Sequence, residues 1–528
     1  MKTRARLTVF AAVVLLYVGV TPFYGGLRNP NELVRVYMTV AMVEQGTFAV
    51  DAVERRWGWV NDKARFGDHV YSSKAPGTST LGVPVYALHR AIGRALGHAP
   101  DLREVTIVLR LGAVTLPSLV FLWFFLGWCE RRAAPHLAHA VFASVAAGSL
   151  LYAYGITFTS HTLNAACAFG AVMALAPGAT TTGARAHARA ALAGLLCAGA
   201  TMFEYPAAIA SAAVGVLSLV RLWPRPGRAR LVSFALGTAP PAAWTMAFHA
   251  SAFGSPWSTG YQHLDNPTFR TNIARGFFGA SSPSPEAFVR LLADPAFGLF
   301  VCTPILLVAF VGLRRALRTE RAETVASIVV FLGMALFVSA LNNWRGGWTV
   351  GPRYLSTVVP FLAGPTLAGL EAIAAVRPGA ASVVAGTTTL LALALCGLVS
   401  AIFPHVPESF GLPFAQLVVP LLRSGNVPYT VAGLLGAPGL LALAPVALAM
   451  LVLVAASTRP VDLGFSTGLA TALLAAAIAL APTTSAHHAA LAHVKRHWEP
   501  RIEATAEAPA GDRELRQTLE RWSRQRSR

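Results

Sequence analysis

NPNELVRVYMTVAMVEQGTFAVD (residues 29–51) and HVYSSKAPG (residues 69–77) bound the most polar part of a chain that is otherwise apolar. The connector between them carries Arg and Trp residues. The whole segment combines Asn, Glu, Asp, Arg, Lys and aromatic residues, whereas the sequence after it is rich in Ala, Leu and Gly. Because the polar residues are so unevenly distributed, we expect the chemistry of this protein to be concentrated in residues 29–77.

The composition of the whole chain indicates a membrane protein. Of its 528 residues, 55% are hydrophobic and 13% are charged, whereas soluble domains carry about 25% charged residues. The net charge of +19 would suit a nucleic-acid partner, but Arg and Lys separate apolar runs here, which is typical of membrane topology. The five cysteines lie in or beside apolar runs without metal-ligand spacing. We therefore expect neither a disulfide nor a zinc site.

The apolar runs predict an all-α polytopic membrane protein with about 13 transmembrane helices of ~20 residues each. Lys2, Arg4 and Arg6 precede the first run, over residues 7–24, which we interpret as an uncleaved signal-anchor helix with a cytoplasmic N-terminus. Further candidate spans begin near Val105, His139, Thr162, Ala188, Pro206, Leu231, Phe297, Thr324, Tyr354, Ala381, Val431 and Leu463. A count of about twelve is the alternative, because the tail after Pro482 carries nine Lys or Arg against six Asp or Glu and would lie outside.

The positions of the basic residues predict the orientation of the membrane domain, residues 1–481. Short loops with a cytoplasmic location carry Arg131, Arg132, Arg185, Arg189, Arg221, Arg225, Arg228, Arg230, Arg314, Arg315, Arg318, Arg321, Arg377 and Arg459. The opposite short turns, residues 155–160 and 203–205, carry no Lys or Arg. This positive-inside pattern predicts periplasmic loops over residues 25–104, 251–295, 342–353 and 404–430, with a charged tail over residues 482–528.

The first periplasmic loop is expected to open with a juxtamembrane helix over residues 30–45. Asn29 is placed to cap it, Glu32 follows three residues after the cap, and Gly46 is placed to end it. Such a helix would lie in the outer interface with one polar stripe that includes Glu32 and Arg35. The alternative is that Glu32 only caps the helix and Arg35 only binds lipid head groups.

Carboxylates and cations in the loops are the candidate functional groups. A carboxylate beside a membrane-facing pocket can act as a general base toward a hydroxyl, and Lys or Arg can bind phosphate oxygens. The predicted catalytic carboxylates are Glu32, Asp51 and Asp68. The predicted donor phosphate-binding residues are Lys74, Arg345, Arg353 and Arg35. The alternatives are solvated loop acids and cations that bind only lipid head groups.

A second polar stretch, NNWRGGWTVGPRY over residues 342–354, combines two Trp, two Arg and a Gly-Gly pair. Its glycines allow the backbone to approach a ligand closely, while its aromatic residues are also ordinary interface anchors. The residues expected to line the substrate are Asn29, Asn31, Tyr71, His161, Glu204, Tyr261, Trp344, Trp348 and Tyr354. No metal ligands are predicted, and a divalent cation is the one cofactor left open.

NPNELVR after the signal anchor, SSKAPG before the second span and WRGGWTVGPRYL before a late span resemble motifs of GT-C-type membrane glycosyltransferases, bacterial relatives of the protein O-mannosyltransferase and lipid A sugar transferase families. The resemblance covers residues 1–375. It implies an inverting hexosyl- or pentosyltransferase at the periplasmic face of the inner membrane, with a polyprenyl-phosphate sugar donor, a glycan, lipid or protein acceptor and a base carboxylate. Relatives usually place an Asp early in the first loop and often before the lysine, where this chain has Glu32 and Ser73.

Two other functions remain as alternatives. The first is a transporter or flippase of a lipid-linked glycan, and the second is an inactive scaffold of the same fold. Ion-coupled transporters place ionisable residues at mid-membrane and often have repeated halves. In this sequence Arg110 is the one clear charge within an apolar segment, and the second half does not mirror the first. These features favour the transferase.

The predicted orientation can be tested with reporter fusions. Fusions after Arg225 and Arg318 should report a cytoplasmic location, because both positions follow clusters of Arg, and fusions near Gln262 should report a periplasmic location. An inverted report at any of the three positions would contradict the topology.

Overall fold

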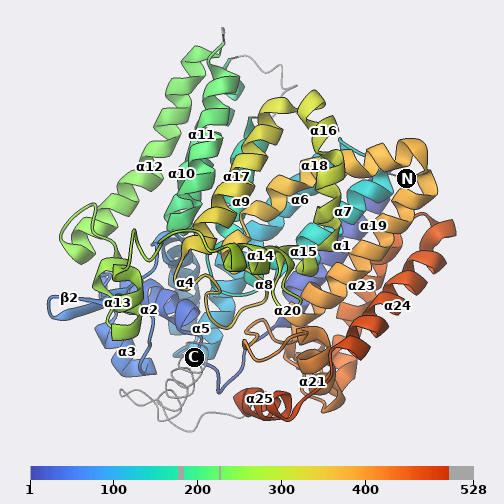
Figure 1. Cartoon of the computed structure of the whole chain (residues 1–528). Coiled ribbons are helices and arrows are strands. Elements are labelled where there is room, and N and C mark those ends of the chain that lie inside the picture. The colour runs from blue at the N-terminus through green and yellow to red at the C-terminus, as the bar shows by residue number, and fades with distance from the viewer. Residues whose placement is uncertain (1, 176–182, 225–226, 499–528) are drawn as a thin grey trace.

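The computed structural model describes residues 2–175, 183–224 and 227–498 (Figure 1). Arg225 and residues 499–528 of the predicted tail lie outside the described residues. Most of the described chain is helical, and its strands form two small two-stranded sheets. The predicted class, an all-α polytopic membrane protein, is confirmed.

Nine helical segments among the described residues are long and apolar enough to cross a membrane. They contain α5 (Leu102–Leu109) with the π-helical η1 (Arg110–Thr115) and α6 (Leu116–Glu130), α10 (Ala184–Phe203), α11 (Ala208–Leu222), α12 (Arg228–Phe253), α17 (Arg321–Ala340), α18 (Val358–Val376), α19 (Pro378–Ala392) with α20 (Val399–Ile402), α23 (Ala444–Ala456) and α24 (Leu463–Leu480). Figure 1 shows them as a bundle of long helices.

The predicted count of 13 is not confirmed, because the other four predicted spans form shorter, interrupted or more charged helices. These are α1 (Lys2–Gly19), α7 (Pro135–Ala147), α9 (His161–Ala174) and α16 (Val308–Thr319). The interruption after α7 lies where the chain packs tightly against α19. At Gly148 a Cβ atom would lie 2.6 Å from the Cβ of Ala392, and Ser149 then caps a new helix, α8 (Leu150–Gly155), by accepting a hydrogen bond from Leu151 N.

The long loops gather toward one end of the bundle, in the lower half of Figure 1. Their helices are α2 (Pro30–Gln45), α3 (Asp51–Trp57), α4 (Gly77–Ala95), α13 (Pro267–Ala274), α14 (Pro285–Ala293), α15 (Leu299–Cys302), α21 (Val419–Arg423), α22 (Val431–Leu434) and α25 (Ser485–Lys495). Ala64 pairs with Leu264, Asn29 contacts His405, and Thr349 N donates to Val406 O. Segments far apart in sequence thus form one layer, residues 25–100, 251–298, 341–357 and 403–430, which we call the loop face.

A β-hairpin, which the sequence analysis did not predict, lies in the first loop. Strands β2 (Lys63–Phe66) and β3 (His69–Ser72) pair antiparallel around a turn at Gly67-Asp68. Gly67 has a positive φ of 57°, a conformation that glycine adopts readily. The second sheet joins β1 (Val20–Thr21) to β4 (Tyr429–Thr430).

Helix α2 matches the predicted boundaries. Asn29 Oδ1 accepts hydrogen bonds from Asn31 N and Glu32 N, and Gly46 ends the helix in the left-handed conformation. Residues 31–41 are all buried, so α2 is covered by protein rather than exposed to lipid along one face. Packing against α4 and α5 encloses α2 in protein, so its polar side chains find protein partners instead of lipid head groups.

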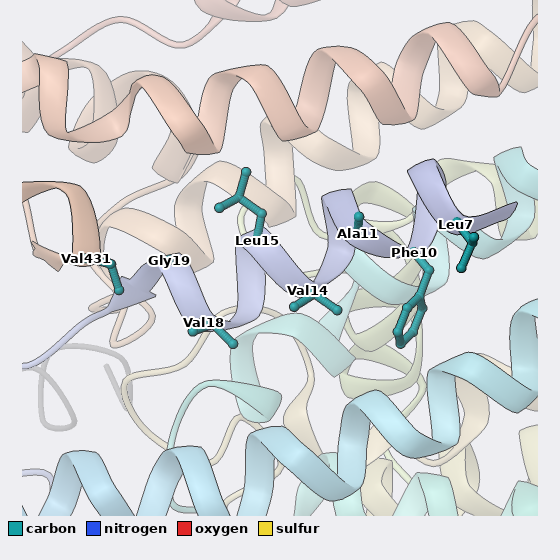
Figure 2. Close-up of a pocket in the computed structure, with 8 residues that line it drawn as sticks. All are labelled: Leu7, Phe10, Ala11, Val14, Leu15, Val18, Gly19 and Val431. Carbon is teal, nitrogen blue, oxygen red and sulfur yellow. The ribbon is translucent and has the colours of Figure 1, made fainter. Parts of the chain in front are cut away.

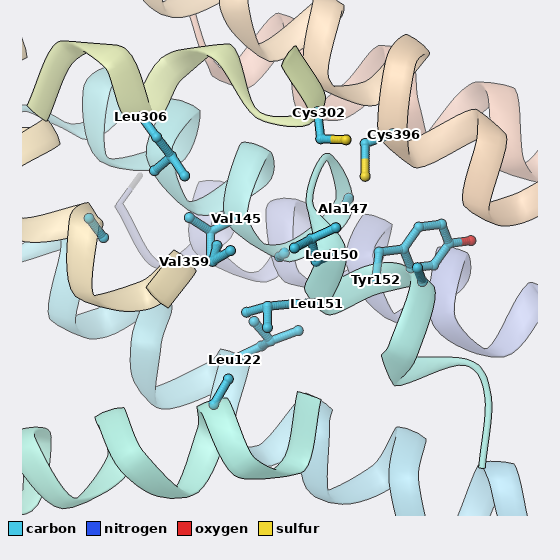
Figure 3. Close-up of a cluster of buried hydrophobic side chains, with 14 of the residues drawn as sticks. Leu122, Val145, Ala147, Leu150, Leu151, Tyr152, Cys302, Leu306, Val359 and Cys396 are labelled. Carbon is cyan, nitrogen blue, oxygen red and sulfur yellow. The ribbon is translucent and has the colours of Figure 1, made fainter. Parts of the chain in front are cut away.

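The apolar core lies within the bundle, around α7 and α8. Figure 3 shows Val145, Leu150 and Leu151 of these helices packed among Leu122 and Val359 from neighbouring helices. All five cysteines are free thiols. The core is therefore built from apolar side chains of several helices that are distant in sequence.

Helix α1 borders an open apolar groove of about 680 Å³, shown in Figure 2. The groove is lined by Leu7, Phe10, Ala11, Val14, Leu15, Val18, Gly19 and Val431. Its lining is apolar along the length of α1, which suits contact with lipid chains.

Close packing of α10 on α12 generates a stability prediction. A Cβ atom at Gly194 would lie 1.9 Å from the backbone oxygen of Phe234, whereas nothing lies within 4 Å of one at Gly215 in α11. Gly194→Ala should therefore destabilise the protein by about 1–3 kcal/mol through overpacking, while Gly215→Ala should be neutral or stabilising by up to ~1 kcal/mol. Thermal unfolding in detergent measures both. Equal midpoints for the two variants would contradict the packing.

Candidate functional site

A buried ion pair joins the first loop to a membrane helix. Arg110 Nε and Nη2 donate to Glu32 Oε1 and Oε2, each at 2.6 Å, and the backbone N of Phe158 donates to Oε1 at 2.6 Å. Both side chains are 4% exposed. Burial raises the pKa of the Glu32 carboxyl, but Arg110 and the Phe158 hydrogen bond outweigh it, so this pKa lies below its usual value. Glu32 therefore holds α2, α5–η1 and the turn before α9 together.

His405 extends this group to the late loop. Its Nδ1 lies 3.0 Å from Asn29 Nδ2, so the residue that caps α2 also contacts residues 403–430. His405, Glu32 and Arg110 border a cavity of about 20 Å³. Burial lowers the pKa of His405 to about 4, with a smaller contribution from Arg110 and against the opposing effect of Glu32.

Arg35 lies one turn after Glu32 on α2 and faces a second polar group. Its Nη1 donates to Asn31 O at 2.6 Å, and its Nη2 donates to Ser160 Oγ at 3.0 Å. The Ser160 hydroxyl donates to the carboxylate of Glu204, whose Oε2 lies 3.6 Å from Arg35 Nη2. Arg35 Nε is buried without a hydrogen-bond partner among the described residues.

The hairpin brings Asp62 to Lys74. Lys74 Nζ lies 2.7 Å from Asp62 Oδ2, and Ser73 Oγ donates to Asp62 O at 2.9 Å and to Oδ1 at 3.2 Å. This contact follows from the β2–β3 register, in which Lys63 pairs with Ser72. Burial raises the pKa of the Asp62 carboxyl, but Lys74, Arg353 and Arg35 together outweigh it, so the pKa lies below its usual value.

Arg353 supplies a third cation from the loop before α18. Its Nη2 donates to Tyr354 Oη at 3.4 Å, and its Nε is buried without a hydrogen-bond partner in the described part of the chain. No carboxylate of the described residues lies within 4.0 Å of its guanidinium. Gly346, at a φ of 78°, allows this position, because a Cβ atom there would lie 2.9 Å from Arg353 Nε.

His161 lies at the start of α9, with a side chain that is 2% exposed. Its ring contacts the rings of Tyr154 and Tyr354, with centroid separations of 4.9 and 6.0 Å. Its Nδ1 lies 3.8 Å from Glu204 Oε2. Neither ring nitrogen has a hydrogen-bond partner among the residues that the structure describes.

These groups form what we call the polar cluster. Its members are Arg35, Asp62, Lys74, His161, Glu204, Tyr261, Arg353 and Tyr354. Tyr261 completes it from the second loop, with its ring 5.6 Å from Lys74 Nζ. With His161 neutral, three cations face two carboxylates, so the cluster carries one positive charge in excess. Such a site can accept an anionic group.

The structure brings many of the predicted site residues together. Of the predicted phosphate-binding residues, Lys74, Arg353 and Arg35 belong to the polar cluster. The predicted lining residues in or beside it are Asn31, which contacts Arg35, and His161, Glu204, Tyr261 and Tyr354.

Other predicted residues have different partners. Glu32 is paired with Arg110, and Asn29 with His405. Arg345 Nε lies 3.7 Å from Glu408 Oε1. Asp51 accepts a hydrogen bond from Val70 N, and Asp68 is exposed in the hairpin turn. The aromatic residues make ring contacts: Tyr71 with Phe253, Trp344 with Phe297, and Trp348 with His493 and His497. The base roles predicted for Glu32, Asp51 and Asp68 stay predictions.

Asp62 is a cluster member that the sequence reasoning did not select. The signal that could have found it is the run KARFGDHVYS, because a Gly-Asp turn between alternating residues predicts a hairpin. Pairing the two strands brings residue 62 beside residue 73. In the described part of the chain, no group of three or more His, Cys, Asp or Glu side chains is arranged to hold a metal ion.

Comparison with solved structures finds membrane glycosyltransferases. The chain is similar to apo ArnT from Cupriavidus metallidurans, with 17% identity and a TM-score of 0.48, over 87% of this chain and 76% of that chain. For ArnT bound to undecaprenyl phosphate the identity is 16% and the TM-score is 0.45, over 88% of this chain and 76% of that chain. The chain is also similar to the oligosaccharyltransferase AglB from Archaeoglobus fulgidus, in complex with an inhibitory peptide and a dolichol-phosphate. Here the identity is 12% and the TM-score is 0.43, over 87% of this chain and 56% of that chain.

Both kinds of neighbour are GT-C glycosyltransferases, and ArnT is a lipid A sugar transferase, so the structures found are of the type that the sequence motifs resemble. At these identities and TM-scores the likeness is distant, and it transfers neither a substrate nor a residue role to this chain. No protein-family model and no curated protein matches the sequence.

The pKa of His405 generates a pH prediction. The folded protein protonates His405 only near pH 4, whereas an unfolded chain protonates histidine near pH ~6.5. Between these values the unfolded state binds more protons, so stability should fall as the pH drops, by up to about 1.4 kcal/mol per pH unit. Thermal unfolding across this range should show a shallower slope for His405→Gln than for the wild type. The control is His69→Gln, which changes an exposed histidine. A slope in His405→Gln equal to that of the wild type would contradict the role of His405 in the pH dependence of stability.

Proposed function

We propose that the protein is a GT-C-type glycosyltransferase of the bacterial inner membrane, which moves a sugar from a polyprenyl-phosphate-linked donor to an acceptor at the loop face. The observation that carries the proposal is the polar cluster with its excess cation. Arg353 has a buried Nε without a partner and no carboxylate within ion-pair distance in the described chain. A phosphate group would supply both missing contacts.

The position of the cluster suits a lipid-linked phosphate. Lys74 lies three residues before the start of α4, and Arg353 lies five residues before the membrane helix α18. A donor with its isoprenoid chain in the membrane would bring its phosphate to the level of these residues. Glycosyl transfer breaks the bond between the sugar carbon and the phosphate oxygen, and negative charge develops on the phosphate. Preorganised cations stabilise that charge in the transition state.

The two carboxylates of the cluster support the same function in a different way. Asp62 holds Lys74 in place, and Glu204 holds Arg35. Because a buried cation without a partner is costly, these pairs allow the site to persist before the donor binds. Arg353, which has no such pair, is the cation expected to gain most from the phosphate.

Removing a phosphate-binding cation should weaken binding of undecaprenyl phosphate, used here as the probe. Lys74→Met and Arg353→Met should each lower its affinity in nanodiscs by about 10- to 100-fold, because a charge-assisted hydrogen bond contributes ~1.5–3 kcal/mol. Arg353→Lys should not restore binding if the contact is bidentate. The matched control is Arg65→Met, which changes an exposed arginine of the same hairpin. Unchanged affinity in all three cluster variants would overturn the phosphate site.

Transfer itself is tested in cells that lack the gene. Mass spectrometry of envelope glycans and lipid-linked sugars should reveal one glycan that is lost in these cells and restored by the wild-type gene. A lipid-linked sugar that accumulates on the wrong side of the membrane would instead indicate a flippase, and unchanged glycans would indicate an inactive scaffold.

A further inference from the structure

We infer that His161 is the general base of this transferase and that Glu204 orients it. The inference rests on the proposed function and goes beyond it by naming the group that accepts the proton of the acceptor hydroxyl. Three observations carry it: the engagement of the nearby carboxylates, the unpaired ring of His161, and the anchoring of the turn that holds this ring.

The carboxylates near the polar cluster are engaged as acceptors. Glu32 receives two hydrogen bonds from Arg110 and one from Phe158 N. The Asp62 carboxylate receives bonds from Lys74 and Ser73. Glu204 receives the Ser160 hydroxyl and pairs with Arg35. Each of these carboxylates would have to give up a buried cation or hydroxyl in order to take a proton from a substrate.

His161 differs from them in having no hydrogen-bond partner for either ring nitrogen among the described residues. Buried polar groups are normally hydrogen-bonded, so an enclosed imidazole without a partner indicates a partner that arrives with the substrate. The ring has an orienting group on one side, because Nδ1 lies 3.8 Å from Glu204 Oε2. A small movement of the ring toward Glu204 would let Nδ1–H donate to the carboxylate and would leave Nε2 as the proton acceptor.

The surrounding charges keep His161 in the neutral form that can accept a proton. Arg353, Arg35 and Lys74 all act on the His161 ring electrostatically, and nearby positive charges favour a neutral imidazole. Once His161 has taken the proton, the carboxylate of Glu204 faces the new charge. This is the logic of a base held in orientation by a carboxylate.

The turn before α9 is held from two sides, which fixes the position of the ring. Phe158 N donates to Glu32, and the Ser160 hydroxyl bridges Arg35 and Glu204. The rings of Tyr154 and Tyr354 then enclose the imidazole. In this arrangement Glu32 acts as a positioning residue for His161, which accounts for its burial without giving it a chemical step.

The acceptor oxygen forms a bond to the sugar carbon while its proton moves to His161 Nε2. The bond between the sugar carbon and the phosphate oxygen breaks, and its electron pair stays on the phosphate that Lys74 and Arg353 face. The proton later leaves His161 to water.

The test uses membrane vesicles from cells that lack the gene and carry either the wild-type or a variant gene, with their own lipid-linked sugars as donors. The initial rate of transfer to the glycan identified above is followed. His161→Gln should lower this rate by about 10²- to 10⁴-fold, the usual contribution of a general base, and should flatten the acidic limb of the rate–pH profile. Its affinity for undecaprenyl phosphate should stay within ~2-fold of the wild type, since the cations that carry the charge-assisted bonds remain.

Two further variants separate a chemical role from a structural one. Added imidazole should restore transfer in His161→Ala, because it can occupy the space of the lost ring. His139→Gln is the matched control, since His139 is also buried but has a partner, with Nε2 3.1 Å from Glu130 Oε1. His139→Gln should retain the wild-type rate and pH profile.

The outcomes distinguish the inference from the proposed function. If the wild type transfers sugar and His161→Gln does so at a similar rate with the same pH profile, the base assignment is overturned and the transferase stands. If His161→Gln loses undecaprenyl phosphate affinity in parallel with its rate, His161 is a binding residue, and the assignment is again overturned. If the wild type transfers no sugar, the proposed function and the inference both fail.

Discussion

The ion pair between Glu32 and Arg110 is the interaction on which the rest of the site depends. Both charges are almost completely buried, and removing one partner of such a pair costs about 3–5 kcal/mol because the other charge stays buried and unpaired. The pair joins α2 to the π-helical turn that begins at Arg110. Through Phe158 N it also holds the turn that presents Ser160 and His161. One carboxylate therefore sets the relative position of three segments that meet at the polar cluster.

The enclosure of α2 explains why these polar residues can be ordered at the end of a membrane bundle. A helix half immersed in lipid would direct its charges toward water or head groups. Here Glu32 and Arg35, three residues apart on one face, reach Arg110 and Glu204, respectively. Each charge is satisfied by another part of the chain, so the first loop and the helices specify each other's position. Among the three cations of the polar cluster, Arg353 is the one that has no carboxylate within ion-pair distance in the described part of the chain.

Local signals predicted those parts of the structure that local chemistry determines. The cap at Asn29, the end at Gly46 and the cations Lys74 and Arg353 follow from residue type and spacing alone. The tight packing at the break after α7 could not be predicted, because it brings Gly148 against Ala392, more than 200 residues away. Asp62 was missed for a related reason. Its partner is set by a hairpin register, and short strands beside a helical signal are easily overlooked.

The same distinction explains why Glu32 was the natural candidate for the base and why the geometry favours His161. A sequence shows which side chains can accept a proton, but it does not show which of them are already bonded. Glu32 has the right chemistry, yet its oxygens accept bonds from Arg110 and Phe158. The sequence indicated His161 as a residue that lines the substrate, but not as one whose ring nitrogens have no hydrogen-bond partner among the described residues. A general base must be able to accept a proton and must not already be occupied by other hydrogen bonds, and only the folded structure shows the second property. In this protein the carboxylates hold the cations and the turn of the site in place. The imidazole of His161 is therefore the group that can take a proton without breaking these contacts.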